Sequence, residues 1–547
     1  MTPSQRSFPS PSMLGLLLLL TTQGPRLEAA APAASASRPT PAPVAAATSA
    51  SAAASTALST GAAARCTGLG RARLETVGQR EVCAVAGRLV RGETFRLLLP
   101  LQEWKGVFSQ LSCTGACAVP AVTLCEAVVR RGHACVVATG HAAGPAREDA
   151  AHELADAAKA LVARFYGQPS RRNLFLGCSG GGQEALLEAQ RHPQDFNGIL
   201  AGAPPVEPAV RARAFDWNLA AVRGTGGHTV LTREDLERLH RAAVRRCDAD
   251  DGLVDGLIGD PLRCRFDPAE LACDRAGAGQ CLSAPAIAAA ARLYAGPPVA
   301  TAAGSSTMAA AAPAMATPAV LAQHRPPGSA GLLPGSEPGW TAWLDPRDPL
   351  AGSLRAPGSP LRAQPAAADP DLSAFAAAGG KLILYHGLAD PLLSPLPTIQ
   401  YFETLARTMH GLVQAQSVVR FFAVPGMGHC GGGDGAARID WLSALETWAG
   451  AGSARPPDDV LGYRLRPGIA PQPPDPFSPA ALDGAQALYA GWMVGGAAPL
   501  EQAREMSATQ LSRPVFAYPL PTRYKGRGDP AHWMNFYAPD DYSLQFE

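Results

Sequence analysis

A serine set among glycines is the clearest candidate for chemistry in this sequence. The stretch GCSGG places Ser179 in a G-x-S-x-G motif, after an apolar run typical of a strand and before a run with helical spacing. In a strand–turn–helix context, the glycines permit a strained turn that exposes the serine hydroxyl at the helix N-terminus. An ordinary glycine-rich turn is the alternative, but the context favours a nucleophile, with the backbone N–H of Gly180 as an oxyanion donor.

A serine hydroxyl is a poor nucleophile without a base, so partners must follow. In the chain order serine, acid, histidine, each partner is expected in a loop after a strand. Asp390 follows the strand-like segment LILYHG, and His429 follows the next one, FFAVPG. His386 is nearer to Asp390, but it ends its strand and is interpreted as structural. We therefore predict a triad in which His429 takes the serine proton and Asp390 orients the imidazole.

Two cysteines stand directly beside the predicted catalytic residues. Cys178 precedes Ser179, and Cys430 follows His429. If the triad assembles, both cysteines lie within a few ångströms of each other. We therefore predict a Cys178–Cys430 disulfide, a pattern far more specific than G-x-S-x-G alone.

The surrounding segments alternate between strand-like and helix-like patterns. Strand-like NLFLG, helical GGQEALLEAQRH and strand-like FNGILAGAP follow one another, which indicates a parallel sheet in an α/β domain. The alternation is lost after about residue 205 and resumes near residue 379 with GGKLILYHG. The simplest interpretation is one α/β domain interrupted by an insertion.

Composition and the N-terminus favour an exported protein. A positive start, the apolar core MLGLLLLL and small residues after it predict a signal peptide over 1–27, and the Ala/Ser/Pro-rich stretch 28–65 is predicted to be a disordered linker. The twelve cysteines then favour disulfides over free thiols. A net charge of +1 gives no reason to expect nucleic acid as a partner, and no apolar run is long enough for a membrane span. A secreted or periplasmic location is expected.

Several blocks of the sequence resemble the tannase and feruloyl esterase family. They include FYGQPSRRNLFLGCSGGGQEALLEAQRHPQDFNGILAGAPP, CDADDGLVDGLIGDPLRCRFDP, GGKLILYHGLADPLLSP, VPGMGHCGGG and YPLPTRYKGRGD. The resemblance implies an α/β-hydrolase core with a large inserted lid domain, and a disulfide between the cysteines beside serine and histidine. On this basis the core is expected at 66–205 and 375–547, the second part with a C-terminal extension, and the lid at 206–374.

The aspartate-rich loop CDADDGLVDGLIGD suggests a second site. It lacks EF-hand spacing, but several carboxylates in a short loop repel one another unless they are solvated or bound to a cation, and hard oxygen ligands suit Ca²⁺. The resemblance implies a structural calcium ion in the lid. Carried over by position, its ligands are the side chains of Asp248, Asp251 and Asp255 and the carbonyls of Leu253 and Leu257. A solvated acidic loop is the alternative.

Further disulfides are expected beyond the one beside the triad. Cys247 and Cys264 flank the acidic loop and are expected to pair, and two more predicted pairs are Cys273–Cys281 and Cys66–Cys83. The partners of the remaining four cysteines stay open: Cys113, Cys117, Cys125 and Cys135.

The chain also departs from the family pattern. It has SCTGACA where the first oxyanion region of the family usually reads G-C-G-G or G-N-G-G, so Thr114 is assigned as second oxyanion donor by position alone. Phe516 stands where a family cysteine often lies, so one late disulfide is missing.

The function expected from these features is hydrolysis of carboxylic esters. The resemblance implies a serine esterase that cleaves esters of aromatic acids, of feruloyl, galloyl or terephthaloyl type, through an acyl-enzyme. The expected partner is a small aromatic ester, and the oligomeric state stays open. The alternatives are a general carboxylesterase or peptidase on the same core, and a catalytically inactive binding protein.

Overall fold

The computed structural model of the chain describes eleven ranges of residues, and every structural statement below concerns these. They are 61–77, 80–90, 92–112, 121–140, 149–223, 228–274, 281–298, 330–340, 366–450, 455–465 and 510–539. The predicted signal peptide over 1–27, most of the predicted linker, Thr114, Cys113 and Cys117 therefore lie outside the described residues.

A nine-stranded sheet forms the centre of the fold, with the strand order β1-β2-β3-β5-β4-β6-β7-β8-β9. The first strands pair antiparallel as far as β5, and all pairs from β5 to β9 are parallel. The strands are β1 (Ala72–Val77), β2 (Arg80–Arg88), β3 (Thr94–Pro100), β4 (Val107–Ser112), β5 (Ala134–Gly140), β6 (Arg172–Cys178), β7 (Gly198–Gly202), β8 (Lys381–Gly387) and β9 (Val419–Val424). In a parallel sheet, loops that follow neighbouring strands meet at one edge.

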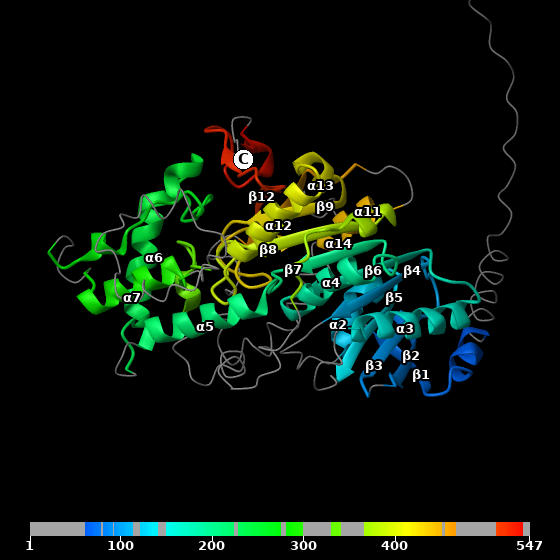
Figure 1. The fold of residues 1–547 in the computed structure, drawn as a ribbon. Helices are drawn as coiled ribbons and strands as arrows, with labels where there is room; N and C mark the ends of the chain where they lie inside the picture. The colour runs from blue at the N-terminus through cyan, green and yellow to red at the C-terminus, as the bar shows by residue number, and fades with distance from the viewer. Residues whose placement is uncertain are drawn as a thin grey trace, which may run out of the picture. The chain divides into compact units, whose positions relative to one another are not determined.

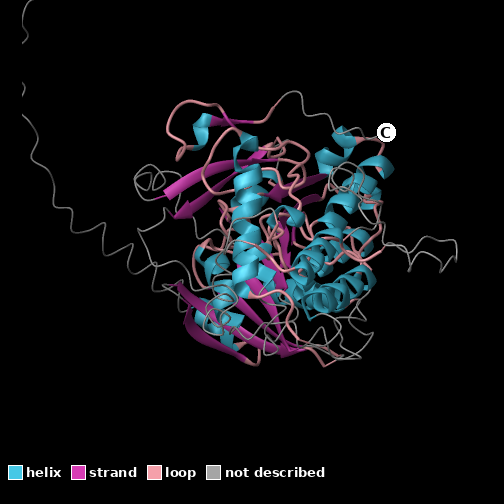
Figure 2. Cartoon of the chain, turned by 90° about the vertical axis from the view of Figure 1, so that its left-hand side faces the viewer, coloured by secondary structure: helices cyan, strands magenta, loops and turns pink. Residues whose placement is uncertain are grey.

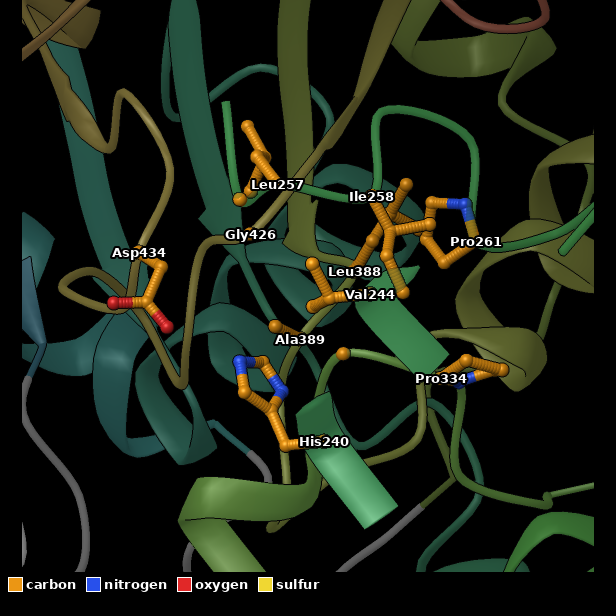
Figure 3. Close-up of a pocket in the computed structure, with 12 residues that line it drawn as sticks. His240, Val244, Leu257, Ile258, Pro261, Pro334, Leu388, Ala389, Gly426 and Asp434 are labelled. Carbon is orange, nitrogen blue, oxygen red and sulfur yellow. The ribbon is translucent and has the colours of Figure 1, made fainter. Parts of the chain in front are cut away.

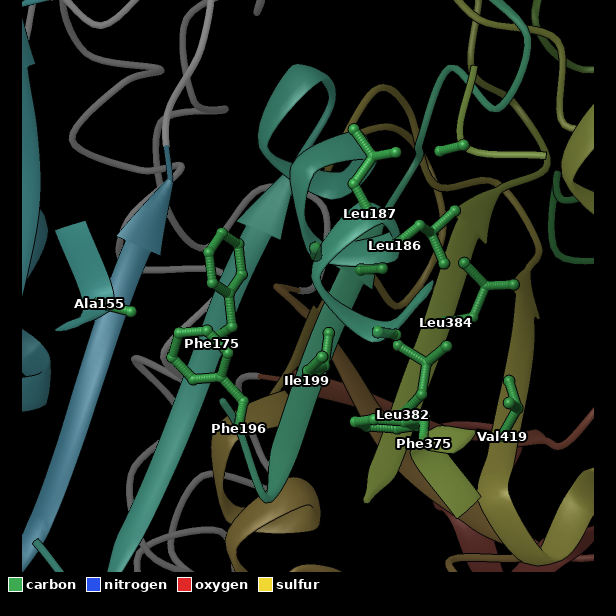
Figure 4. Close-up of a cluster of buried hydrophobic side chains, with 14 of the residues drawn as sticks. Ala155, Phe175, Leu186, Leu187, Phe196, Ile199, Phe375, Leu382, Leu384 and Val419 are labelled. Atoms are coloured by element: carbon green, nitrogen blue, oxygen red, sulfur yellow. The ribbon is translucent and has the colours of Figure 1, made fainter. Parts of the chain in front are cut away.

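Helices cover both faces of this sheet. The side chains of the strands accordingly divide between two buried clusters, one on each face. Phe175 of β6 points into the first cluster, whereas Leu174 and Leu176 belong to the second. The first cluster packs against α3 (Ala150–Tyr166), α4 (Gly180–Arg191), α11 (Ser373–Ala377), α12 (Leu396–Thr408) and α13 (Leu412–Val418), and part of it is drawn in Figure 4. The second packs against α2 (Ala121–Arg130) and α14 (Trp441–Trp448). The α/β-hydrolase expectation agrees with this two-sided arrangement.

The insertion between β7 and β8 has a hydrophobic cluster of its own. Its helices are α5 (Pro208–Arg223), α6 (Arg233–Cys247) and α7 (Ala284–Ala295), with short 3₁₀ turns η2 (Asp248–Asp251), η3 (Pro268–Leu271) and η4 (Glu337–Trp340). Figure 1 shows α5, α6 and α7 beside one another, and Figure 2 distinguishes the helices from the strands by colour. A capping box fixes the start of α6, where Thr232 and Asp235 satisfy each other's backbone N–H groups. A separate core of this kind is typical of a lid domain.

Two predicted boundaries differ from the structure. Residues 61–67 are helical, with Ala62 and Cys66 fully buried, so the predicted linker does not extend to residue 65. The Cys66–Cys83 disulfide explains the difference, because it ties this helix to β2. At the other boundary, Ala367 and Leu372 pack in the first cluster of the sheet, although they were assigned to the lid.

The C-terminal part of the chain adds two small sheets. One joins β10 (Arg438–Ile439), β11 (Asp459–Leu465) and β12 (Gln510–Phe516), and the other joins β13 (Arg523–Tyr524) and β14 (Phe536–Tyr537). A last 3₁₀ turn, η6 (Trp533–Asn535), precedes β14. None of the helices described is both long and apolar enough to span a bilayer.

Candidate active site

Ser179 lies on a sharp turn between β6 and α4. Its backbone has φ 58° and ψ −125°, a strained conformation for a residue with a side chain, and the residue is half-buried. The flanking glycines are required by close packing. A Cβ on Gly177 would lie 2.1 Å from the carbonyl oxygen of Gly181, and one on Gly181 would lie 2.3 Å from that of Ser112. The motif therefore forms the turn expected of a nucleophile elbow.

Asp390 and His429 meet in the loops after β8 and β9. The Nδ1 atom of His429 is 2.7 Å from Oδ2 of Asp390. The other carboxylate oxygen of Asp390 accepts the backbone N–H groups of Leu392 and Leu393, each at 2.9 Å. Asp390 is only 1% exposed, so these contacts fix its orientation. With Nδ1 bound to the carboxylate, Nε2 of His429 is the nitrogen left for proton transfer.

His386 is a contact of Asp390 that the sequence analysis assigned only a structural role. Its Nε2 atom lies 3.3 Å from Oδ2 of Asp390 and 3.1 Å from the carbonyl oxygen of Leu393, while Nδ1 is 2.9 Å from the hydroxyl of Thr398. Burial acts to raise the pKa of Asp390, but His429 and His386 outweigh it and hold that pKa well below its usual value. The carboxylate of Asp390 is therefore ionised at neutral pH, where it accepts a hydrogen bond from His429 and orients the ring.

The lowered pKa of Asp390 predicts a dependence of stability on pH. A depressed folded-state pKa contributes stability above the unfolded value of about 3.9, and this contribution is lost as the pH falls toward the folded value. We expect the free energy of unfolding of the wild type, minus that of Asp390→Asn, to be constant above about pH 5 and to shrink below about pH 4. Urea unfolding of both proteins across this range measures it. A difference in unfolding free energy that grows as the pH falls would contradict the lowered pKa of Asp390.

The predicted Cys178–Cys430 disulfide is present, with its two Cα atoms 6.1 Å apart. It joins the end of β6 to the loop that carries His429, across 252 residues of sequence. Cys430 also has a positive φ, of 63°, so both loops that the bond connects are strained. Among the described residues, no hydrogen bond joins the hydroxyl of Ser179 to His429. Catalytic hydrogen bonds are often long in the absence of substrate.

The other disulfides account for the remaining described cysteines. The predicted pairs Cys66–Cys83, Cys247–Cys264 and Cys273–Cys281 are all present. The sequence left Cys125 and Cys135 unassigned, and the structure pairs them between α2 and β5. None of the described cysteines is free.

Gly180 and Thr114 were the two predicted oxyanion donors. Gly180 is the first residue of α4, directly after Ser179, so its N–H is one of the helix-terminal donors without an intrahelical partner. Thr114 lies outside the described residues.

A pocket lies where the lid meets the loops of Asp390 and His429 (Figure 3). Leu388 and Ala389 line it from the acid loop, and Gly426 lines it from the base loop. The lid contributes Leu257 of the aspartate-rich loop and His240 of α6, whose ring is 3.1 Å from the buried carboxylate of Glu337. The lid is therefore in direct contact with the loop that carries the base.

Gly426 is a point of close contact between the base loop and the lid. A Cβ there would lie 2.3 Å from Cδ1 of Leu257 and 2.7 Å from the backbone nitrogen of Gly435, at a φ of +64°. We expect Gly426→Ala to displace the base loop and to lower kcat/KM about 100-fold, since a shift of about 1 Å can cost that much. Gly379→Ala is the matched control, because Gly379 has a φ of +78° with no atom within 4 Å of the added methyl. Equal losses in both variants would show that backbone strain alone is responsible.

Known proteins of similar sequence identify the family of this chain. Residues 76–325 and 352–538 match the family model for tannase and feruloyl esterase. The chain belongs to this family. It is 29% identical over 454 residues to mono(2-hydroxyethyl) terephthalate hydrolase of Piscinibacter sakaiensis, covering 70% of the chain and 66% of that protein. It is 30% identical over 323 residues to a probable feruloyl esterase of Arthroderma benhamiae, covering 55% of the chain and 59% of that protein.

A solved structure in the family shares the fold. Feruloyl esterase B from Aspergillus oryzae aligns with a TM-score of 0.62 at 19% identity, covering 87% of this chain and all of that one (100%). The shared fold therefore extends over most of the chain. In the curated relatives, by contrast, the matched regions span less than two thirds of the protein.

The aspartate-rich loop is the place where the family resemblance implies calcium. Asp248 is buried and accepts the backbone N–H groups of Asp255 and Gly256, at 3.1 and 3.0 Å. Asp255 also contacts Arg513 at 2.8 Å. Burial, together with the nearby carboxylates of Asp255 and Asp248, raises the pKa of Asp251 to about 7, although its hydrogen bond from Leu253 acts the other way. Neighbouring carboxylates of which one is buried are a donor set that suits a cation.

The spacing of the three carboxylates is looser than a bound ion requires. Among the described residues, three side-chain ligand atoms come within 4.8 Å of one another only in a different cluster, formed by His152, His192 and Asp195. The oxygen donors of the aspartate-rich loop nevertheless suit calcium, and the Cys247–Cys264 disulfide closes the loop. Ion binding would require the three aspartates to draw together.

Proposed function

We propose that the protein is a serine esterase that works through an acyl-enzyme. The observation that carries this proposal is the 2.7 Å contact between His429 and Asp390, together with the disulfide that ties the loop of His429 to the turn of Ser179. The order serine, aspartate, histidine and the position of each after a strand are those of an α/β hydrolase.

The mechanism follows from the positions of these groups. The hydroxyl of Ser179 attacks the ester carbonyl carbon as Nε2 of His429 takes its proton, and the N–H of Gly180 donates to the resulting oxyanion. Asp390 stabilises the imidazolium. His429 then gives the proton to the leaving alcohol, and a water molecule, activated by the same histidine, releases the acid from Ser179.

The proposed substrates are esters of aromatic acids. Support comes from the relatives, which are named as a terephthalate-ester hydrolase and a feruloyl esterase. We expect kcat/KM on at least one of methyl ferulate, methyl gallate and mono(2-hydroxyethyl) terephthalate to exceed that on an aliphatic ester of similar length. Activity on the aliphatic ester alone would favour the general carboxylesterase, and cleavage of an amide analogue at a comparable rate would favour a peptidase.

We also propose a structural calcium ion on the aspartate-rich loop, held by Asp248, Asp251 and Asp255 with the carbonyls of Leu253 and Leu257. The ion would neutralise the clustered carboxylates and hold the loop whose Leu257 lies against Gly426. Export to an oxidising compartment is part of the same proposal, since the described cysteines form five disulfides.

Removal of calcium is expected to lower thermal stability more than it lowers the initial rate. The stabilisation that a bound ion gives to the folded state grows with the logarithm of the ratio of its concentration to Kd. It amounts to about 2.7 kcal/mol when the concentration is 100 times Kd. We expect EDTA to lower Tm, added Ca²⁺ to restore it, and Asp251→Ala to have a low Tm that no longer responds to added Ca²⁺. Restoration by Zn²⁺ but not by Ca²⁺ would argue against this site, as would an unchanged Tm in metal-free buffer.

A further inference from the structure

A second group of potential metal ligands lies at the C-terminal end of α4, the helix that begins directly after Ser179. His152 belongs to the first turn of α3, His192 caps the C-terminus of α4, and Asp195 follows in the turn before β7. One ligand atom from each of the three lies within 4.8 Å of the others. The two imidazole rings are stacked, with centroids 3.9 Å apart and planes 4° from parallel, and Nδ1 of His152 is 2.5 Å from Oδ2 of Asp195.

The neighbours of this cluster are arranged as the supporting groups of a metal site usually are. Lys159 contacts the other oxygen of Asp195, Oδ1, at 3.0 Å, which leaves Oδ2 facing His152. Nε2 of His152 lies 3.6 Å from Asp156, whose carboxylate can accept the proton of that nitrogen when Nδ1 is the ligand. A ligating histidine commonly donates its second N–H to a carboxylate in this way.

The surroundings also carry acidic groups that lack a full set of partners. Asp149 lies 3.4 Å from Nε2 of His192 and is nearly half exposed, so it can supply a further oxygen. Glu188, one turn before His192 on α4, is 1% exposed, and its Oε2 atom has no hydrogen-bond partner. A divalent cation at the cluster would offset the negative charges of Asp149 and Asp195. Glu188 adds no charge near neutral pH, because burial raises its pKa to about 9.

We propose that His152, His192 and Asp195 form a binding site for a transition-metal ion, with Zn²⁺ as the expected occupant. Two imidazole nitrogens and one carboxylate oxygen form a donor set that suits zinc and is too rich in nitrogen for calcium or magnesium. In a tetrahedral zinc site with bonds of about 2.0–2.1 Å, ligand atoms lie about 3.3 Å apart. To reach this spacing the two rings must turn out of their parallel stack, because a metal ion lies in the plane of each imidazole that binds it. The side chains of His152 and His192 are partly exposed, at 32% and 21%, which leaves room for this rotation.

The proposed zinc site is separate from the chemistry at Ser179. Ser179 and His192 cap opposite ends of α4, and a helix of this length spans about 18 Å at about 1.5 Å per residue. A metal ion here would instead connect the start of α3 to the end of α4. We therefore expect zinc to stabilise the fold rather than to take part in ester hydrolysis.

The test is Zn²⁺ binding to the full chain, stripped of metals and then supplied with excess Ca²⁺ so that the aspartate-rich loop stays occupied. Isothermal titration with ZnCl₂ is expected to show one site in the wild type and an affinity lowered more than about tenfold in His192→Gln and in Asp195→Asn. His228→Gln is the matched control, because His228 is exposed and remote in sequence from the cluster. Melting curves should show Tm rising with the Zn²⁺ concentration in the wild type and the control only.

Two results would overturn the zinc site. One is the absence of Zn²⁺ binding to the wild type. The other is equal binding to the wild type and to whichever of His192→Gln and Asp195→Asn folds, which would place the ion elsewhere, for example at His429. Because the readouts are heat of binding and Tm, the outcome does not depend on whether the protein hydrolyses esters.

Discussion

Replacing Ser179 by alanine is expected to lower ester hydrolysis by several powers of ten and to leave Tm almost unchanged. The hydroxyl is the attacking group, and loss of a triad member typically costs about 10⁴- to 10⁶-fold in kcat. Ser179 is half-buried and makes no side-chain hydrogen bond among the described residues, so removing its oxygen costs the fold little. Steady-state kinetics on the best aromatic ester, with melting curves of the same samples, measure both quantities.

Ser373→Ala is the matched control for this variant, because Ser373 is an exposed serine at the start of α11. It should keep wild-type activity. Asp390→Asn and His429→Ala should also be severely impaired, and combining either with Ser179→Ala should add little, since the three residues act as one unit. Retention of more than about a tenth of the activity in Ser179→Ala would exclude this serine as the nucleophile.

Removing the disulfide between the catalytic loops is expected to reduce activity and stability together. In the loop-entropy account, a bond across 252 residues contributes about 5.5 kcal/mol, although measured values are often lower. Its loss also frees two loops with positive φ, at Ser179 and Cys430, to relax away from each other. We therefore expect Cys178→Ser with Cys430→Ser to unfold at lower urea concentration and to lose about 100-fold or more in kcat/KM.

The control for this double variant is Cys273→Ser with Cys281→Ser. That disulfide closes a separation of only 8 residues in the lid, so its entropic contribution is smaller and the catalytic loops remain tied. The control should lose some stability and keep most of its kcat/KM. If the two double variants lose activity equally, the bond beside the triad has no special role in positioning it.

Much of the candidate site could be predicted because its residues are adjacent in sequence to strong local signals. Ser179 follows a buried strand and precedes a helix, and Cys178 and Cys430 each adjoin a predicted catalytic residue. Once two neighbours of the triad are cysteines, assembly of the triad implies their pairing. The fold class followed for a similar reason, since strand and helix patterns have different periods.

Other features could not be predicted because they depend on packing between elements. Cys125 and Cys135 pair because α2 lies against β5, which no spacing along the chain encodes. Likewise, His152 meets His192 and Asp195 only because α3 packs beside α4. His386 is different, because its position four residues before Asp390 was visible in the sequence, and only the path of the loop makes it a contact of the carboxylate.

The boundary errors have a similar origin. Residues 61–65 have the alanine-rich composition of the linker before them, but the buried Cys66–Cys83 bond provides the packing that the composition alone lacks. Ala367 and Leu372 were placed in the lid because the strand pattern had not yet resumed, yet they fill the same cluster as Phe375. Sequence patterns mark where regular elements start, whereas domain boundaries depend on which core a side chain joins.

The acyl-enzyme at Ser179 is the central claim, and rapid mixing with a p-nitrophenyl ester of an aromatic acid tests it most directly. We predict a burst of p-nitrophenol equal to about one per folded chain, followed by slower turnover, as expected when an acyl-enzyme accumulates. Mass spectrometry of the acid-quenched protein should locate the acyl group on the peptide that contains GCSGGG. Turnover with no acyl adduct in the wild type, or an adduct that persists in Ser179→Ala, would contradict the account.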